Sequence, residues 1–164
     1  MTMGKIETLA ALYEEHMRAP WQRTLAGSQR VLMVVYEKEL ERSFRARREE
    51  FAQATRRAEH GWVEFDVTAL FAEWMASDEY REAYFETPSD ITTKIESEFP
   101  QSVAHGLRAA LQNSDDTGVV AITGVSSLFG FARVSDLLRI VERDIRGRLV
   151  VFFPGTRDGN NYRL

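Results

Sequence analysis

Runs rich in apolar residues predict four buried strands along this chain. They are Val31 to Tyr36, Trp62 to Val67, Val119 to Val125 and Leu149 to Phe153. Long stretches of apolarity, rather than strict alternation, are typical of strands that helices cover on both faces of a sheet. A helical segment joins the third and fourth runs, so these two strands are predicted to be parallel and linked by a right-handed crossover.

Helical spacing of apolar residues predicts the elements between the strands. An amphipathic helix is expected from Lys5 to Met17, and a highly charged one from Glu39 to His60, with Gly61 ending it in a left-handed turn. A helical insert occupies about residues 68–113, between the second and third strands. Because Pro100 lies inside this helical pattern, we expect a kink or two consecutive helices there.

These elements predict an α/β fold made of one three-layer domain over residues 1–164. The sheet should be mostly parallel, with about four strands, and either Rossmann-like or degenerate P-loop-like, with the helical insert before the third strand. A length of 164 residues suits one domain with a substantial core.

Composition narrows the class of protein. The chain is 44% hydrophobic and 28% charged, with a formal net charge of -4, which argues against a generally basic nucleic-acid-binding coat. Without cysteine there can be no disulfide, thiolate zinc site or cysteine nucleophile. Neither a signal peptide nor an apolar run of about 18 residues is present, so we expect a soluble, cytoplasmic protein without membrane contact.

The glycine-bearing loop after the third strand is the first candidate for chemistry. A P-loop needs four residues between its glycines and then a lysine, whereas five separate Gly124 from Gly130, and Phe131 stands in the place of the lysine. No G-x-S-x-G elbow is found, and the three histidines have no i,i+4 partner. We therefore expect no catalytic residue, no metal and no cofactor, with a degenerate nucleotide-binding domain as an alternative.

The arginines of the predicted 39–60 helix suggest a second alternative, a nucleic-acid-binding accessory subunit. Arg42, Arg45, Arg56 and Arg57 are spaced along this helix and could contact phosphates. Glutamates interleave with them, however, and can form ion pairs at i,i+4 spacing. A solvated helix is therefore the favoured interpretation.

Five pieces of the chain resemble a known family. PWQRTLAGSQRVLMVVY, KIESEF, SSLFGFARVSDLLR, RGRLVVFFPG and NNYRL, in this order, are similar to the BrxB family of BREX (bacteriophage exclusion) systems. The resemblance implies phage defence beside a BREX adenine methyltransferase, the alkaline-phosphatase-like protein PglZ and a large ATPase. The family has no established catalytic motif. Its members continue past NNYRL into a further strand, so the resemblance also implies a chain that lacks its C-terminal end.

From the resemblance and the missing catalytic motifs we expect a non-enzymatic interaction or scaffold subunit. It would support host DNA methylation and phage restriction by its partner proteins. PglZ is the favoured partner, and the BREX ATPase and methyltransferase are alternatives. Aromatic residues outside the predicted core are candidates for the partner surface: Phe129 and Phe131 in the glycine-bearing loop, and Tyr80, Tyr84 and Phe85 in the insert.

Overall fold

The computed structural model describes residues 4–77, 88–158 and 161–163. Its helices are α1 (Lys5–Arg18), α2 (Glu41–Arg57), α3 (Leu70–Ser77), α5 (Pro88–Ser97), α6 (Phe99–Gln112) and α7 (Val134–Val141), with short 3-10 helices η1 (Gly27–Arg30), η2 (Lys38–Leu40), η3 (Val125–Leu128) and η4 (Glu142–Asp144). Its strands are β1 (Val31–Tyr36), β2 (Gly61–Asp66), β3 (Gly118–Thr123), β4 (Arg148–Pro154), β5 (Thr156–Asp158) and β6 (Asn161–Arg163).

A four-stranded sheet with the order β1-β4-β3-β2 forms the centre of the fold, and all its strand pairs are parallel. Val31 of β1 lies opposite Leu149 of β4, and Gly61 of β2 lies opposite Gly118 of β3. The four predicted strands and the α/β class are therefore confirmed. The strand order differs from that of the dinucleotide-binding sheet, so the Rossmann-like part of the prediction receives no support from the topology.

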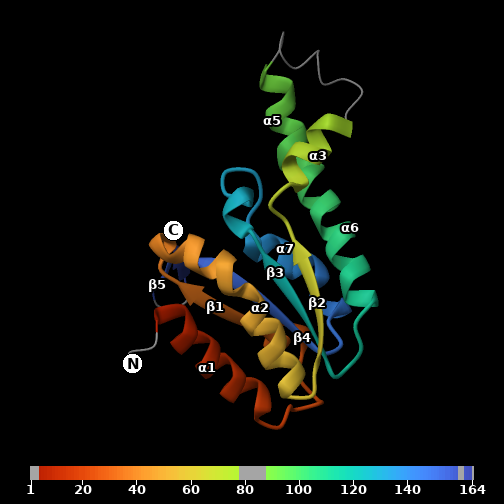
Figure 1. Cartoon of the computed structure of the whole chain (residues 1–164). Helices are drawn as coiled ribbons and strands as arrows, with labels where there is room; N and C mark the ends of the chain where they lie inside the picture. The colour runs from red at the N-terminus through yellow and green to blue at the C-terminus, as the bar shows by residue number, and fades with distance from the viewer. Residues whose placement is uncertain (1–3, 78–87, 159–160, 164) are drawn as a thin grey trace.

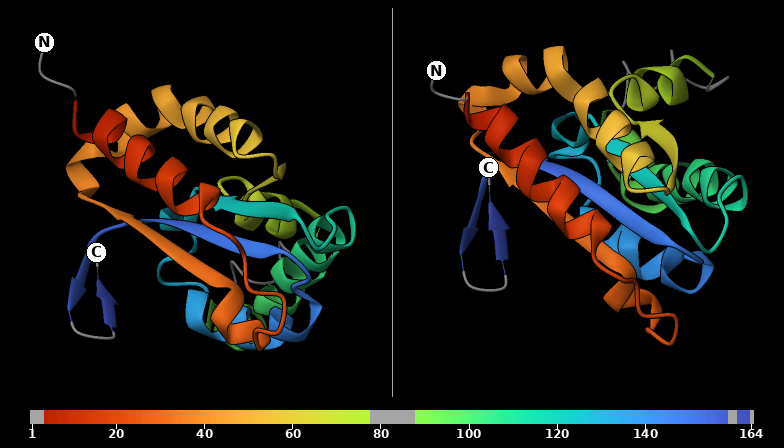
Figure 2. Two further views of the ribbon diagram at one scale, coloured as in Figure 1. Left: turned by 90° about the horizontal axis from the view of Figure 1, so that it is seen from below. Right: turned by 60° about the horizontal axis from the view of Figure 1, so that its bottom comes forward.

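Helices cover both faces of this sheet and give three layers (Figure 2). On one face, α1 and α2 pack on the alternate residues Val119 and Ala121 of β3 and Val150 and Phe152 of β4. On the other face, α6 and α7 pack on the residues between these. The chain passes from β1 at one edge of the sheet to β2 at the other edge, and then returns through β3 to β4. Because both kinds of connection are right-handed but run in opposite directions across the sheet, their helices lie on opposite faces.

The helical insert extends beyond the carboxyl ends of the strands (Figure 1). Helix α5 ends at Ser97 and α6 begins at Phe99, with Pro100 in the first turn of α6, where a missing backbone N–H costs nothing. The prediction of two consecutive helices at Pro100 is confirmed. Buried residues Phe99, Val103 and Leu107 fix α6 on the sheet, and α3 packs against the same core through partly buried residues.

A small antiparallel hairpin, β5–β6, follows β4 and stands apart from the main sheet (Figure 2). The Gly155 backbone N–H donates to the Tyr36 carbonyl at 2.8 Å, which ties the start of the hairpin to the carboxyl end of β1. The hairpin thus leaves the sheet at the β1 side.

Candidate functional site

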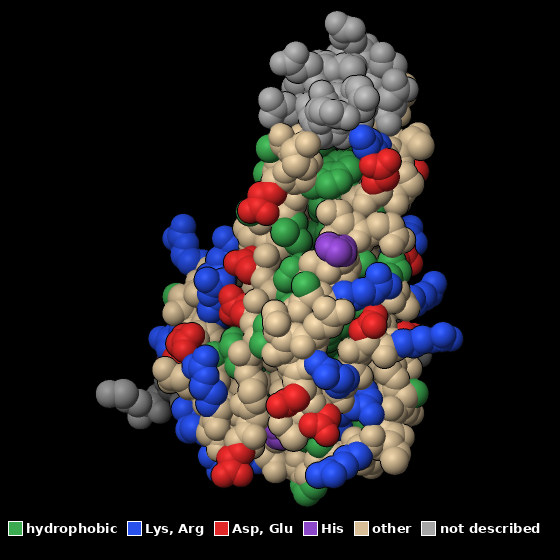
Figure 3. Space-filling model, turned by 90° about the vertical axis from the view of Figure 1, so that its right-hand side faces the viewer, with side chains coloured by type: hydrophobic (Ala, Val, Ile, Leu, Met, Phe, Trp, Pro, Cys, Tyr) green, Lys and Arg blue, Asp and Glu red, His purple; other side chains and the backbone are tan. Residues whose placement is uncertain are grey.

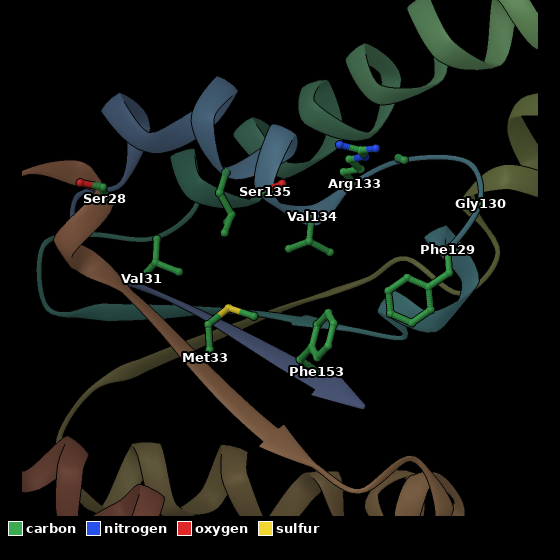
Figure 4. Close-up of a pocket in the computed structure, with 11 residues that line it drawn as sticks. Ser28, Val31, Met33, Phe129, Gly130, Arg133, Val134, Ser135 and Phe153 are labelled. Carbon is green, nitrogen blue, oxygen red and sulfur yellow. The ribbon is translucent and has the colours of Figure 1, made fainter. Parts of the chain in front are cut away.

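A pocket of about 620 Å³ lies between the sheet and the start of α7 (Figure 4). We call it the β1 groove. Strands β1 and β4 form its floor, the N-terminal turn of α7 forms one wall, and the loop after η3 closes one end. Its lining is mainly apolar and consists of Ser28, Val31, Met33, Phe129, Gly130, Ala132, Arg133, Val134, Ser135, Leu138 and Phe153.

The groove exists because helices α6 and α7 do not reach the edge strand. Residues of β3 and β4 are buried along the strands, whereas Val31, Met33 and Val35 of β1 are only partly buried. These three alternate residues point to the same face of the sheet. This face of β1 is therefore only partly covered by helices, and its apolar side chains form the floor of the groove. Sequence reasoning missed Met33 as a site residue, because an apolar run does not reveal which strand lies at the edge.

The two edges of the sheet differ in the features that discourage strand pairing. Edge strand β2 carries Glu64 and Asp66, both exposed. Edge strand β1 has the sequence VLMVVY, without charge, proline or glycine. Charges and prolines are the usual protection of an edge against an incoming strand, so β1 is the unprotected edge.

The loop after β3 uses its polar atoms internally. Gly124 has φ of 76°, a left-handed conformation, and a Cβ there would come within 2.1 Å of Thr68 Oγ1. The Ser127 hydroxyl lies within hydrogen-bond distance of the Gly124 carbonyl at 2.7 Å and the Val67 carbonyl at 3.0 Å. The four-residue helix η3 follows. These contacts hold the loop against β2 and give the nucleotide-binding alternative no support.

Phe129 and Phe131, the two aromatic candidates of this loop, point to different places. Phe129 lines the β1 groove and packs edge-on against Phe153, with ring centroids 5.6 Å apart. Phe131 instead stacks on Phe71 at the base of the insert, with centroids 3.9 Å apart, and 36% of it is exposed. The candidates Tyr80, Tyr84 and Phe85 lie outside the described residues. The loop therefore joins two separate apolar surfaces.

Three of the four candidate arginines on α2 pair with carboxylates. Arg45 lies 3.0 Å from Glu41, Arg56 lies 3.2 Å from Glu49, and the Arg57 Nε donates to Glu14 of α1 at 2.8 Å. Only Arg42 among the four has no carboxylate partner within the described parts of the chain. Glutamates thus neutralise most of this surface, as the interleaved sequence suggested.

Asp66, at the carboxyl end of β2, acts as a cap. Its Oδ1 accepts hydrogen bonds from the Thr68 backbone N–H at 2.9 Å and from the Thr68 hydroxyl at 2.6 Å, just before α3 begins. Partial burial raises the pKa of Asp66, but the bonds from Thr68 and from Arg48 outweigh it and hold the pKa below its ordinary value. Burial raises the pKa of Glu64, with Arg48 opposing the shift. These contacts are structural.

Other classes of site are not visible in the structure. Among the described residues, no group of three or more histidine, aspartate or glutamate side chains is placed to hold a metal ion. None of the described helices combines the length and apolarity needed to cross a membrane. The β1 groove is the site that we consider further.

A comparison with protein families shows which family the chain belongs to. Residues 63–164 match the model of the family described as BREX protein BrxB. No curated protein and no solved structure matches the chain significantly. The matched part begins in β2 and includes α7, β4 and the loop with Phe129, so one wall of the β1 groove lies inside it and β1 lies outside it.

Proposed function

The chain belongs to the BrxB family of BREX proteins, and from this premise we propose that it is a non-catalytic interaction subunit of its phage-defence system. A BREX component works with other BREX proteins. The observation that supports an interaction role here is the β1 groove, an open and mainly apolar surface. Apolar surfaces of this kind are typical docking sites.

The proposed occupant of the groove is an extended segment of a partner protein. Within the described residues, strand β1 pairs with β4 alone, so its outer edge can accept a further strand. Alternate side chains of that strand would lie beside Val31, Met33 and Val35 and enter the groove, while its backbone would hydrogen-bond to β1. The exposed Arg133 at the rim favours an acidic residue in the same segment. PglZ is the favoured partner, with the BREX methyltransferase and ATPase as alternatives.

In this proposal the protein supports host DNA methylation and phage restriction through its partners. The stacked pair of Phe131 and Phe71 offers a second apolar contact beside the groove, at the base of the insert. One partner chain that follows the loop between Phe129 and Phe131 would touch both surfaces. A Phe131→Ala variant should therefore weaken, but not abolish, partner binding.

The test is co-purification of the chain with PglZ, the methyltransferase and the ATPase expressed from the same system. A Ser135→Arg variant places a long charged side chain at the mouth of the groove, at an exposed position. Its matched control is Ser43→Arg, also at an exposed serine in the first turn of a helix, but on α2.

We expect Ser135→Arg to reduce partner recovery at least tenfold and Ser43→Arg to leave it unchanged, with equal thermal stability of both variants. Failure of the wild-type chain to associate with any of the three BREX proteins would refute the interaction role. Equal recovery with Ser135→Arg and Ser43→Arg would refute the groove as the surface.

A further inference from the structure

Five arginines that form no ion pair within the described residues gather at the end of the molecule where the strands begin. They are Arg23, Arg30, Arg143, Arg146 and Arg148, and we call them the arginine cluster. Within the described ranges none of them forms an ion pair, whereas ten other lysines and arginines do. Figure 3 shows basic side chains over the lower part of the molecule, where the strands begin, with acidic side chains among them. Arginines without an ion pair are thus concentrated at this end, in a chain whose net charge is -4.

Close backbone packing brings the segments of the arginine cluster together. A Cβ built on Gly27 would lie only 1.8 Å from the Glu142 carbonyl oxygen, so η1 and η4 touch through a position that only glycine permits. The Arg30 guanidinium donates to the carbonyls of Arg23 and Arg146. Segments more than a hundred residues apart thus form one surface.

Backbone carbonyls hold the guanidinium groups of Arg30, Arg146 and Arg148 in place, and only Arg146 also interacts with a nearby carboxylate, that of Asp115, among the described residues. Arg146 donates to the Gln112 carbonyl at 3.0 Å, and Arg148 donates to the Gln22 carbonyl at 3.0 Å. Each guanidinium has five N–H donors, so some remain available beyond these bonds. The positive charges also face one another: burial lowers the pKa of Arg148, and the charge of Arg30 lowers it further. An arriving anion would relieve this repulsion.

The aromatic contact at the same place orders Arg148 further. Its guanidinium carbon lies 4.6 Å from the centre of the Trp21 ring, and Trp21 stacks on His60 with centroids 3.7 Å apart and planes 5° from parallel. His60 is itself fixed, since its ring nitrogens lie 2.8 Å and 3.0 Å from the carbonyls of Thr117 and Met17. A cation held on an aromatic ring loses little entropy when it binds a ligand.

We infer that the arginine cluster binds the phosphodiester backbone of a nucleic acid, as a function separate from partner docking in the β1 groove. Planar guanidinium forks match the geometry of phosphate oxygens and can donate two hydrogen bonds to one phosphate group. Several such groups on one surface suit a polymer that presents phosphates at regular intervals. This surface also differs from the α2 arginines, which glutamates already neutralise.

The test measures fluorescence anisotropy of labelled 20-mer duplex DNA, single-stranded DNA and RNA with the whole chain, from about 50 to 200 mM salt. The variant is Arg23→Glu with Arg143→Glu, because these two side chains are exposed and hold no other segment in place. The control is Lys38→Glu with Arg42→Glu, which makes the same change of net charge at two exposed basic residues elsewhere that also lack ion pairs within the described residues.

Wild-type binding should weaken with salt, and the cluster variant should lose at least tenfold in affinity and about two in the log–log salt slope, roughly 0.9 for each lost phosphate contact. The control should stay within about twofold of wild type. The inference is overturned if the control loses as much as the variant, or if no nucleic acid binds at the lowest salt. Binding of poly-glutamate in place of the nucleic acids would also overturn it. Co-purification with BREX proteins is measured separately, so the two proposals can fail independently.

Discussion

Replacing Tyr13 by phenylalanine tests how firmly α1 is bound to the rest of the fold. Tyr13 is 4% exposed, and its hydroxyl lies 2.6 Å from the Thr55 hydroxyl, which donates in turn to the Phe51 carbonyl at 2.7 Å. The substitution removes one buried hydrogen bond but leaves Thr55 with a partner. At pH 7 we expect the free energy of unfolding to fall by about 1 kcal/mol.

The same substitution should reverse its effect in alkali. Burial raises the pKa of Tyr13 to about 12 from 10.0, although the bond with Thr55 lowers it slightly. A phenol with a raised pKa stabilises the folded state fully below pH 10 and loses this contribution as the pH rises through 12. At pH 11 the wild type has lost about 1.4 kcal/mol in this way. The variant loses nothing here, so it should then be slightly more stable than wild type.

Urea unfolding followed by tryptophan fluorescence at pH 7, 9, 10 and 11 measures this crossing. Tyr36, whose pKa burial also raises, is present in both proteins and cancels from the difference. The control Thr55→Val leaves the Tyr13 hydroxyl buried without its acceptor, so it should cost about 1–3 kcal/mol at pH 7 and keep the alkaline loss. A stability difference between wild type and Tyr13→Phe that stays constant from pH 7 to pH 11 would refute the reasoning.

Two further predictions concern the loop after β3 and the cap of α3. Gly124 and Gly130 have similar positive φ angles of 76° and 86°, but only Gly124 has atoms where a Cβ would lie. In thermal unfolding, Gly124→Ala should therefore lose about 1–3 kcal/mol more than Gly130→Ala, and equal losses would show that Thr68 moves aside freely. The depressed pKa of Asp66 stabilises the fold above its ordinary value of 3.8, and this stabilisation disappears as the pH falls through the lower folded-state pKa. In the Asp66→Asn variant, the free energy of unfolding should therefore fall less steeply than in wild type as the pH drops below about 4. The same pH dependence in both proteins would contradict this prediction.

The order of elements could be predicted from the sequence because local patterns determine it. Apolar runs located four strands, and Pro100 located the boundary between α5 and α6, since proline is excluded from a helix interior but accepted in a first turn. Local reasoning was wrong at the end of α2. The left-handed residue there is Glu59, with φ of 66°, whereas Gly61 is the first residue of β2. We predicted the left-handed turn at Gly61 because glycine adopts positive φ angles easily, whereas Glu rarely does.

The groove and the arginine cluster could not be predicted, because each depends on strand order. No periodicity shows that β1 lies at the edge, and so none shows that Met33 is only partly buried while Val151 is fully buried. Likewise, the sequence favoured a solvated α2 helix with its arginines paired within the helix, but the partners of Arg57 and Arg48 come from α1 and β2. Contacts between distant elements decide which charges remain unpaired.

The pairing of β1 with β4 also constrains how the chain folds during synthesis. Val31 lies opposite Leu149, so β1 leaves the ribosome 118 residues before the strand it needs. At about 5–20 residues per second, this is a delay of roughly 6–24 s. During that time VLMVVY has no strand beside it on either edge, and α1 and α2 have only part of the sheet to pack on. Strand β1 is the first strand to be synthesised but can pair only after β4 is made, so we expect chaperones to bind it in the meantime.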